Sequence, residues 1–424
     1  MNKQNKTRII QIGLFVLTLI VTTIAGAEWM TGRYLFFTEP AMSWQDFLNG
    51  FNYSIPFLLI LTCHEFGHYL TAKYHKVKTT LPYYIPMWLG FIPTLSFGTM
   101  GAFIQIKDLI VSRKQFFDIG IAGPLAGFVI AIGVILYGYN NLPEPEQIFE
   151  VHPEYEQFGL DYAEHVYDHE FQVSQHYQMY LKARVADSLD YLTTNTNEND
   201  VWAYPEFEAF ESYPNLSFNK PLLFQFIESF IEDKSRIPNE REIMHNPYLL
   251  AGLLALFFTA LNLFPIGQLD GGHIVFGLLG TKNSEIVSKV LFSIFVFYAG
   301  LGLININELA DVSIGASLNF LILILGYLYF LYVCAYSLFK SKQDRLTFAA
   351  VVLTLQFLLN YLFAWEGYSG WLLFSLVLGR FIGVKHPPVI DDTPLSLERK
   401  VLGWFALFIF VISFSPEPFI MDGF

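Results

Sequence analysis

Long apolar runs separated by short polar segments make up most of the chain. Runs of this length and composition predict helices that cross a membrane, and one of them carries ionisable residues in its middle. The predicted spans are residues 9–27, 53–74, 116–139, 248–269, 286–304, 318–339, 348–365, 371–384 and 401–414. The pattern therefore predicts an all-α polytopic membrane protein.

Basic residues cluster at one side of these predicted spans and set their orientation. Lys3, Lys6 and Arg8 precede the first span, and the basic clusters at 73–78 and 340–345 fall on the same side. Because loops rich in Lys and Arg stay inside, the N-terminus is expected to be cytoplasmic. No small-residue cleavage site follows the first run, which favours an uncleaved span over a signal peptide, and no Arg- and Ser-rich transit segment is present. A bacterial plasma membrane is therefore expected rather than a plastid.

Composition supports this class and divides the chain. Hydrophobic residues make up 53% of the chain and charged residues 15%, which excludes an ordinary soluble globule. The net charge is −13, and residues 141–245 alone hold 21 acidic and 6 basic residues. We therefore predict an inserted acidic extramembrane domain at 141–245 between two halves of a membrane core, 1–140 and 246–424. Such acidity rules against a nucleic acid partner and indicates a water-exposed domain, while the apolar spans are expected to lie in the lipid bilayer.

The second predicted span contains His64-Glu65-Phe66-Gly67-His68, an H-E-x-x-H pattern. Residues i and i+4 of a helix share one face, so the two histidines can offer two nitrogens to one Zn²⁺, with Glu65 beside the water that such an ion would hold. Buried ionisable groups in hydrocarbon are costly unless they pair or bind a ligand, which makes this span a candidate functional site. A polar helix face satisfied by neighbouring helices is the alternative.

Catalytic zinc sites need a third protein ligand and one open position, so another ligand must come from a distant part of the chain. Asp270 is the candidate, in the string L-D-G-G-H, and the predicted topology puts it in the same half of the bilayer as His64 and His68. Pro265 and Gly267 are expected to break the helix just before Asp270. Taken alone, Asp270 would be a helix-capping residue in a glycine-rich turn.

Residues 79–107 are apolar but too rich in proline and glycine for a regular helix. Alternating aromatic and β-branched residues favour short strands, so a re-entrant β-hairpin at membrane depth is expected. An unpaired strand edge could hold an extended substrate, and Gly98, Gly101 and Phe103 are the candidate substrate-binding residues. A surface lid lying on the bilayer fits the same pattern.

Two further patterns allow both a structural and a functional interpretation. Gly123 and Gly127 form a G-x-x-x-G pattern in the third predicted span, which favours close helix packing over chemistry. In the acidic region, His165, His169 and His176, with Asp168 and Glu170, could bind a metal at i, i+4 spacing. A solvated helix face produces the same pattern.

Together the two long-range motifs resemble the site-2 protease family, the intramembrane zinc metalloproteases. The resemblance rests on the H-E-x-x-H string and on residues 262–272, which form N-x-x-P-x-x-x-L-D-G-G. Weaker matches are residues 98–102 and the Gly123-Pro124 helix, and the whole similarity covers about residues 55–280. Residues 81–86, 98–104 and 386–389, with Asp391 and Asp392, are similar to the branch that includes bacterial and plastid members.

This resemblance implies a fold and a site. The fold would be a site-2-protease-like helical core, with His64, His68 and Asp270 as ligands of a Zn²⁺ cofactor. The family's catalytic glutamate corresponds to Glu65, and its asparagine that contacts substrate or reaction intermediate corresponds to Asn262.

The implied function is a zinc-dependent intramembrane endopeptidase that hydrolyses peptide bonds in or near transmembrane segments of membrane proteins. The alternative is a membrane metal transporter or metal-binding protein without proteolytic activity, which would use the same ligands. A pseudoprotease that holds membrane clients is disfavoured because every catalytic residue type is present.

Overall fold

Helices form most of the structure, a computed structural model that describes residues 3–38, 40–92, 96–194, 204–209, 215–304 and 314–422. Residues 93–95 of the predicted hairpin, and 195–203 and 210–214 of the predicted insertion, lie outside the described residues. The α-helices are α1 (Lys3–Thr31), α2 (Trp44–Asn49), α3 (Phe51–Tyr74), α4 (Arg113–Asn140), α5 (Ile148–Val151), α6 (His169–Thr194), α7 (Leu222–Glu228), α8 (Pro247–Leu263), α9 (Asp270–Ala299), α10 (Ile314–Cys334), α11 (Lys342–Phe363), α12 (Leu372–Leu376) and α13 (Leu397–Ser413). The strands are β1 (Tyr83–Met87), β2 (Gly98–Phe103), β3 (Asn215–Phe218) and β4 (Phe419–Asp422).

Four helical segments of the described chain are long and apolar enough to cross a membrane: Asn5–Thr31, Arg113–Asn140, Phe320–Ser337 and Lys342–Phe363. The apolar helix α8 is shorter. The helix α3 is not among the four because His64, Glu65 and His68 make its middle polar. These segments fit a membrane protein, while the count of nine spans stays a prediction.

The chain breaks between α8 and α9, as Pro265 and Gly267 predict. Gly267 has a φ of 61°, a conformation that favours glycine. The helix α8 ends at Leu263, so the predicted span at 248–269 is too long, and Asp270 opens a new helix instead. That helix is interrupted at Gly280, where φ is 76° and ψ is 175°. The sequence pattern missed its first segment because it is short and partly polar.

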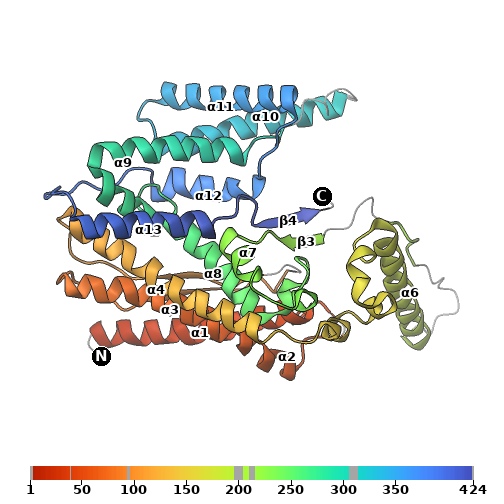
Figure 1. Cartoon of the computed structure of the whole chain (residues 1–424). Helices are drawn as coiled ribbons and strands as arrows, with labels where there is room; N and C mark the ends of the chain where they lie inside the picture. Colours follow the sequence, from red (N-terminus) through yellow and green to blue (C-terminus); the bar gives the residue numbers. More distant parts are fainter. Residues whose placement is uncertain are drawn as a thin grey trace.

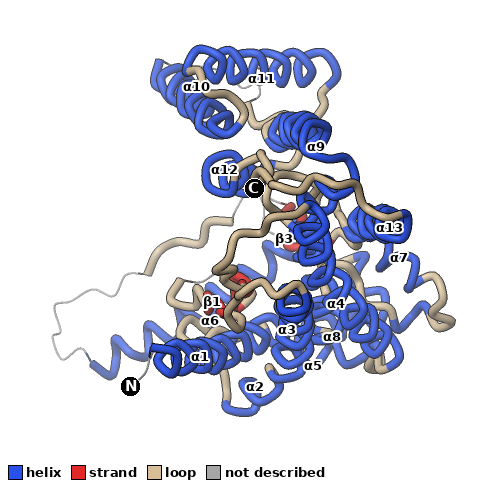
Figure 2. Tube along the Cα trace, turned by 90° about the vertical axis from the view of Figure 1, so that its left-hand side faces the viewer, coloured by secondary structure: helices blue, strands red, loops and turns tan. Residues whose placement is uncertain are grey.

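Two clusters of buried apolar side chains hold the helices together. The first joins α1, α3, α4, α7, α8 and α13, and the second joins the later part of α9 to α10, α11 and α12. Figures 1 and 2 show the same two layers, with α10 and α11 above α9 and α12, and with α1, α3, α4 and α8 below. The H-E-x-x-H helix α3 therefore lies inside the first layer.

The segment between α3 and α4 forms the expected pair of strands. β1 and β2 are antiparallel, with Tyr83 opposite Phe103 and Met87 opposite Gly98, and with an irregularity between Tyr84 and Pro86. The pair packs on α1, where the Gln11 side-chain amide donates to the Leu81 carbonyl at 2.6 Å. Its depth in a membrane stays a prediction.

Residues after α4 form short helices and the long helix α6, which lies to one side of the helical layers (Figure 1). β3 then pairs antiparallel with β4 at the C-terminal end of the described chain. Lys220 and Tyr139 both bond to the Glu228 carboxylate, at 2.6 Å each, which joins α7 to the end of α4. The described part of 141–245 is therefore attached to the helical layers at several points.

Candidate metal centre

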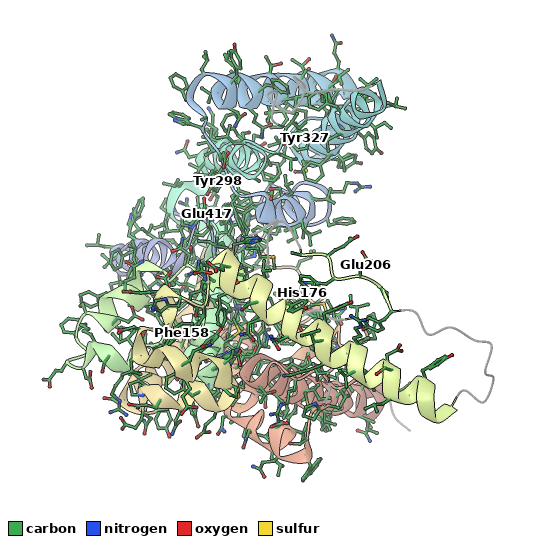
Figure 3. All side chains as sticks on the ribbon, turned by 90° about the vertical axis from the view of Figure 1, so that its right-hand side faces the viewer. Phe158, His176, Glu206, Tyr298, Tyr327 and Glu417 are labelled. Carbon is green, nitrogen blue, oxygen red and sulfur yellow. The ribbon has the colours of Figure 1, made fainter. Side chains whose placement is uncertain are left out.

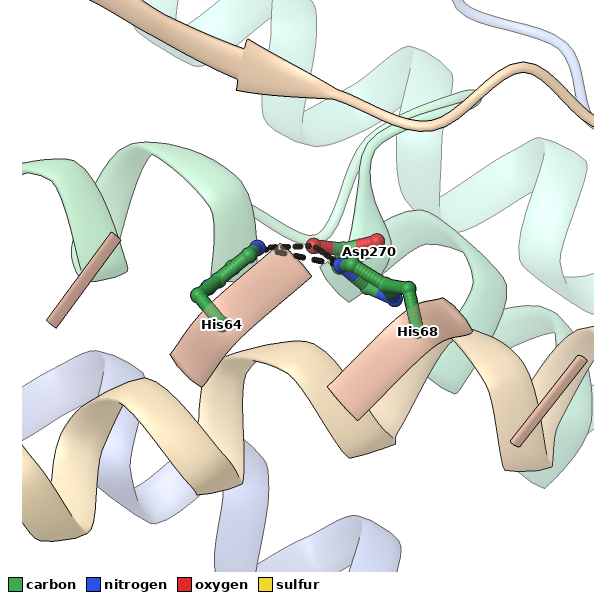
Figure 4. A group of neighbouring side chains, drawn as sticks. All are labelled: His64, His68 and Asp270. Atoms are coloured by element: carbon green, nitrogen blue, oxygen red, sulfur yellow. Dashed lines mark hydrogen bonds and ion pairs between the residues drawn. The ribbon is translucent and has the colours of Figure 1, made fainter. Parts of the chain in front are cut away.

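His64 and His68 lie one turn apart on the same face of α3, and both are buried. Their Nε2 atoms are 3.0 Å apart. This closeness follows from the i, i+4 spacing, because side chains four residues apart lie above one another on a helix. Figure 4 shows the two rings turned toward a common point.

Asp270 reaches that point from the first turn of α9. Its Oδ2 lies 3.2 Å from Nε2 of His68 and 3.5 Å from Nε2 of His64 (Figure 4). Gly271 and Gly272 make the approach possible: a Cβ on Gly271 would lie 1.9 Å from the Leu263 carbonyl oxygen. The three ligand-type atoms lie within 4.8 Å of one another.

The surroundings of these atoms fit a divalent metal ion. Nδ1 of His68 lies 2.7 Å from the Ile119 carbonyl oxygen, which only accepts, so this nitrogen carries the proton and Nε2 keeps a free lone pair. A histidine ligand held in this way by a backbone carbonyl is the usual arrangement around a metal. Two imidazoles and one carboxylate are also a donor set of catalytic zinc sites.

Glycines of α4 leave the space that the two histidines occupy. A Cβ on Gly123 would lie 2.1 Å from Nε2 of His68, and one on Gly127 would lie 3.1 Å from Cβ of His64. The G-x-x-x-G pattern therefore does more than permit close packing of α3 and α4. It also leaves room for the proposed ligand atoms.

A cavity of about 310 Å³ opens beside the three residues. Glu65 and Asn262 line it together with His64, His68 and Asp270. Both residues that the sequence assigns to catalysis thus face the same space as the proposed metal ligands. The carboxylate of Glu65 is a possible proton acceptor there, and the Asn262 amide is a possible hydrogen-bond donor.

The three candidate substrate-binding residues lie at different distances from this cavity. Phe103 lines it and is half exposed. Gly101 lines a neighbouring small cavity together with His64 and Asn262. Gly98 lies at the other end of β2, where a Cβ would be 2.3 Å from Cα of Thr22 in α1.

Sequence reasoning assigned no role to a histidine in the wall of the site or to a second histidine in contact with it. His273 lines the cavity, and its Nδ1 lies 2.8 Å from Nε2 of His386. The His386 ring stacks on Phe276, with a centroid distance of 3.8 Å. His273 could have been found from its i+3 spacing to Asp270, whereas His386 comes from a distant loop and was singled out only through the family resemblance.

Comparisons with known proteins agree with this arrangement. A sequence model of the family described as "Peptidase family M50" matches residues 52–303, more than half of the chain. No solved structure matches the chain significantly.

The curated relatives are plant proteins. "Probable zinc metalloprotease EGY1, chloroplastic" of Arabidopsis thaliana is 26% identical over 53% of this chain and 29% of its own length. "Probable zinc metalloprotease EGY2, chloroplastic" of Oryza sativa subsp. indica is 24% identical over 59% of this chain and 31% of its own length. "Probable zinc metalloprotease EGY3, chloroplastic" of the same organism is 23% identical over 65% of this chain and 37% of its own length. The matches thus span only about a third of each of these relatives.

Proposed function

The chain belongs to peptidase family M50, and on that premise we propose that it is a zinc-dependent endopeptidase that cleaves membrane proteins in or near their transmembrane segments. The single observation that carries the proposal is the convergence of His64, His68 and Asp270 beside a cavity that Glu65 also lines. A hydrolase of this type needs such a ligand set and a carboxylate beside it.

The chemistry follows from what each side chain can do. His64, His68 and Asp270 would hold Zn²⁺, which supplies a Lewis acid and makes a bound water more acidic. Glu65 accepts a proton from the attacking water and later gives it to the leaving amine, because a carboxylate can serve both steps. The Asn262 amide donates a hydrogen bond to the oxyanion that develops on the scissile carbonyl.

The strand pair offers a way to hold the substrate. A peptide bond in a helix has its carbonyl already hydrogen-bonded, so the substrate must be extended before attack. β2 pairs with β1 along one edge, and its end at Phe103 reaches the cavity of Glu65. We propose that an extended substrate segment binds along β2 near Gly101 and Phe103, while the packing of Gly98 against α1 supports a role in positioning the strand.

The proposed membrane location rests on the distribution of basic residues along the chain. The basic clusters support a multi-pass arrangement with the N-terminus on the cytoplasmic side. The bacterial plasma membrane expected from the sequence has no support from the relatives, whose printed names are chloroplastic. We therefore propose a membrane location, with transmembrane proteins as substrates and the acidic segment at 141–245 outside the bilayer.

Replacement of Glu65 by Gln tests the proposed function. The purified protein and its Glu65→Gln variant are incubated with a reporter that has a single membrane span, and zinc is counted in both samples. We expect equal zinc content and a loss of cleavage of about 10²–10⁴-fold, the usual contribution of general acid–base catalysis. Equal product formation by both proteins, or no product from either, would refute the peptidase proposal. A metal transporter predicts no product from either protein.

A further inference from the structure

A second group of metal-ligand side chains lies outside the membrane helices. His152 follows α5, Glu242 precedes the 3₁₀ turn Ile243–His245, and His245 ends that turn just before α8. One ligand atom from each lies within 4.8 Å of the others. Within the described part of the chain, only this group and the candidate metal centre meet that condition.

The distances in this group match those of the candidate metal centre. Nε2 of His152 is 3.2 Å from Nε2 of His245. Oε2 of Glu242 is 3.1 Å from Nε2 of His245 and 3.7 Å from Nε2 of His152. In the first site the corresponding distances are 3.0, 3.2 and 3.5 Å. Two imidazole nitrogens and a carboxylate oxygen thus meet in the same way twice in one chain.

Hydrogen bonds behind the two rings determine which nitrogen is free. Nδ1 of His245 lies 2.7 Å from the Met30 carbonyl oxygen, and Nδ1 of His152 lies 3.2 Å from a carboxylate oxygen of Glu154. Both partners only accept, so each Nδ1 carries its proton and each neutral ring keeps a lone pair on Nε2. With both rings neutral, three acceptor atoms face one another, and a proton or a metal ion between them removes the repulsion.

The third side chain is also held in position. Glu242 is 4% exposed, and its Oε1 accepts a hydrogen bond from the Tyr167 hydroxyl, which leaves Oε2 to face the two rings. A cavity of about 790 Å³ reaches Glu242 and His245 and gives an ion a way in. Ligands supported in this way by outer hydrogen bonds are typical of metal sites.

We propose that His152, Glu242 and His245 bind a second divalent transition metal ion, with Zn²⁺ as the best match for two nitrogen donors and one oxygen donor. Ca²⁺ and Mg²⁺ match poorly because they prefer oxygen ligands. The ion joins the end of α5 to the turn before α8, and the Met30 carbonyl connects it to α1. This site is separate from the proposed peptidase centre and does not depend on it.

The sequence pattern pointed to other histidines, His165, His169 and His176. α6 begins at His169, so His165 lies before the helix and the i, i+4 geometry does not apply to this pair. The His165 ring stacks on Phe158 at 4.7 Å, and Figure 3 shows Phe158 well apart from His176. His165 and His169 therefore provide a matched control pair in the same acidic segment.

Counting zinc in the purified 424-residue chain tests the proposal. Each protein is stripped with a chelator, reloaded with Zn²⁺ alone and freed of excess ion. We expect two zinc ions per chain in the wild type and in His165→Ala/His169→Ala. We expect one in His152→Ala/His245→Ala and one in His64→Ala/His68→Ala, and each of these two variants loses a different ion.

A Co²⁺ titration tests the site even where the His152→Ala/His245→Ala variant does not fold. In the His64→Ala/His68→Ala background, Co²⁺ is added with and without Glu242→Gln, which keeps the size of the side chain and removes its charge. We expect the d–d absorption of bound Co²⁺, with an affinity at least tenfold lower in the Glu242→Gln protein. A zinc content that is the same in the wild type and in His152→Ala/His245→Ala, or identical Co²⁺ titrations, would overturn the proposal and leave a shared proton as the cation between the rings.

Discussion

The Gly123→Ala variant should lose zinc binding at the candidate metal centre. A Cβ at this position would lie 2.1 Å from Nε2 of His68, so restoring an ordinary contact of 3.4 Å moves that atom by about 1.3 Å, whereas a metal site tolerates about 0.2 Å. The ring cannot swing away freely because its Nδ1 is held by the Ile119 carbonyl. A displacement of this size is expected to lower activity at least about 100-fold, or about 2.7 kcal/mol in the activation free energy.

Two other glycines of α4 form a graded series with Gly123. A Cβ on Gly127 would lie 3.1 Å from Cβ of His64, which requires a shift of a few tenths of an ångström, and one on Gly133 would touch nothing within 4 Å. Zinc affinity and activity should therefore fall in the order Gly133→Ala, Gly127→Ala, Gly123→Ala. The Gly133→Ala variant is the control and should match the wild type in both, since alanine is the better helix former.

The assay measures zinc content, reporter cleavage and thermal unfolding of the three variants in detergent. We expect Gly123→Ala to lose zinc while its unfolding transition stays cooperative. A Gly123→Ala protein with wild-type zinc content and turnover would refute the argument, because the ligand atom would then not occupy the place described.

Three more predictions concern the candidate metal centre and the helices around it. Asn262→Ala should lower kcat by about 10²–10³-fold while the zinc content stays that of the wild type. Both quantities are measured on the same sample, and an unchanged kcat would exclude the oxyanion role. Removal of zinc by a chelator should abolish reporter cleavage, and Zn²⁺ alone should restore it; cleavage that persists after chelation argues against metal catalysis. Arg113 is buried and donates to the Gly277 carbonyl at 2.9 Å. Arg113→Met should therefore destabilise the fold by about 1.5–3 kcal/mol, measured by thermal unfolding. Lys114→Met changes an exposed neighbour and should leave the unfolding temperature unchanged.

The meeting of α3 with the start of α9 could be foreseen because each motif carries a local signal. The i, i+4 spacing of His64 and His68 needs only a helix, and Asp270 needs only the break that Pro265 and Gly267 impose. Their nearness in the structure agrees with that reasoning, while their role as zinc ligands stays a prediction. The contacts of Gly123 could not be foreseen, because a G-x-x-x-G pattern does not say which side chain fills the space it leaves.

Sequence patterns could not predict the contacts between distant loops. His152 and His245 meet across a long stretch of chain. Glu242 and His245 have i, i+3 spacing, but no local pattern links them to His152. The cluster with the expected spacing, around His165 and His169, does not assemble because the helix begins too late. His386 similarly reaches His273 from a loop near the end of the chain. Spacing rules work within one helix and give no information on which loops come together.

A zinc-edge anomalous diffraction map of the 424-residue chain tests the central claim most directly. The account predicts a peak at about 2.0–2.2 Å from Nε2 of His64, Nε2 of His68 and a carboxylate oxygen of Asp270, which are zinc-ligand distances. A map with no peak between these three side chains, or with zinc bound there without Asp270, would contradict it.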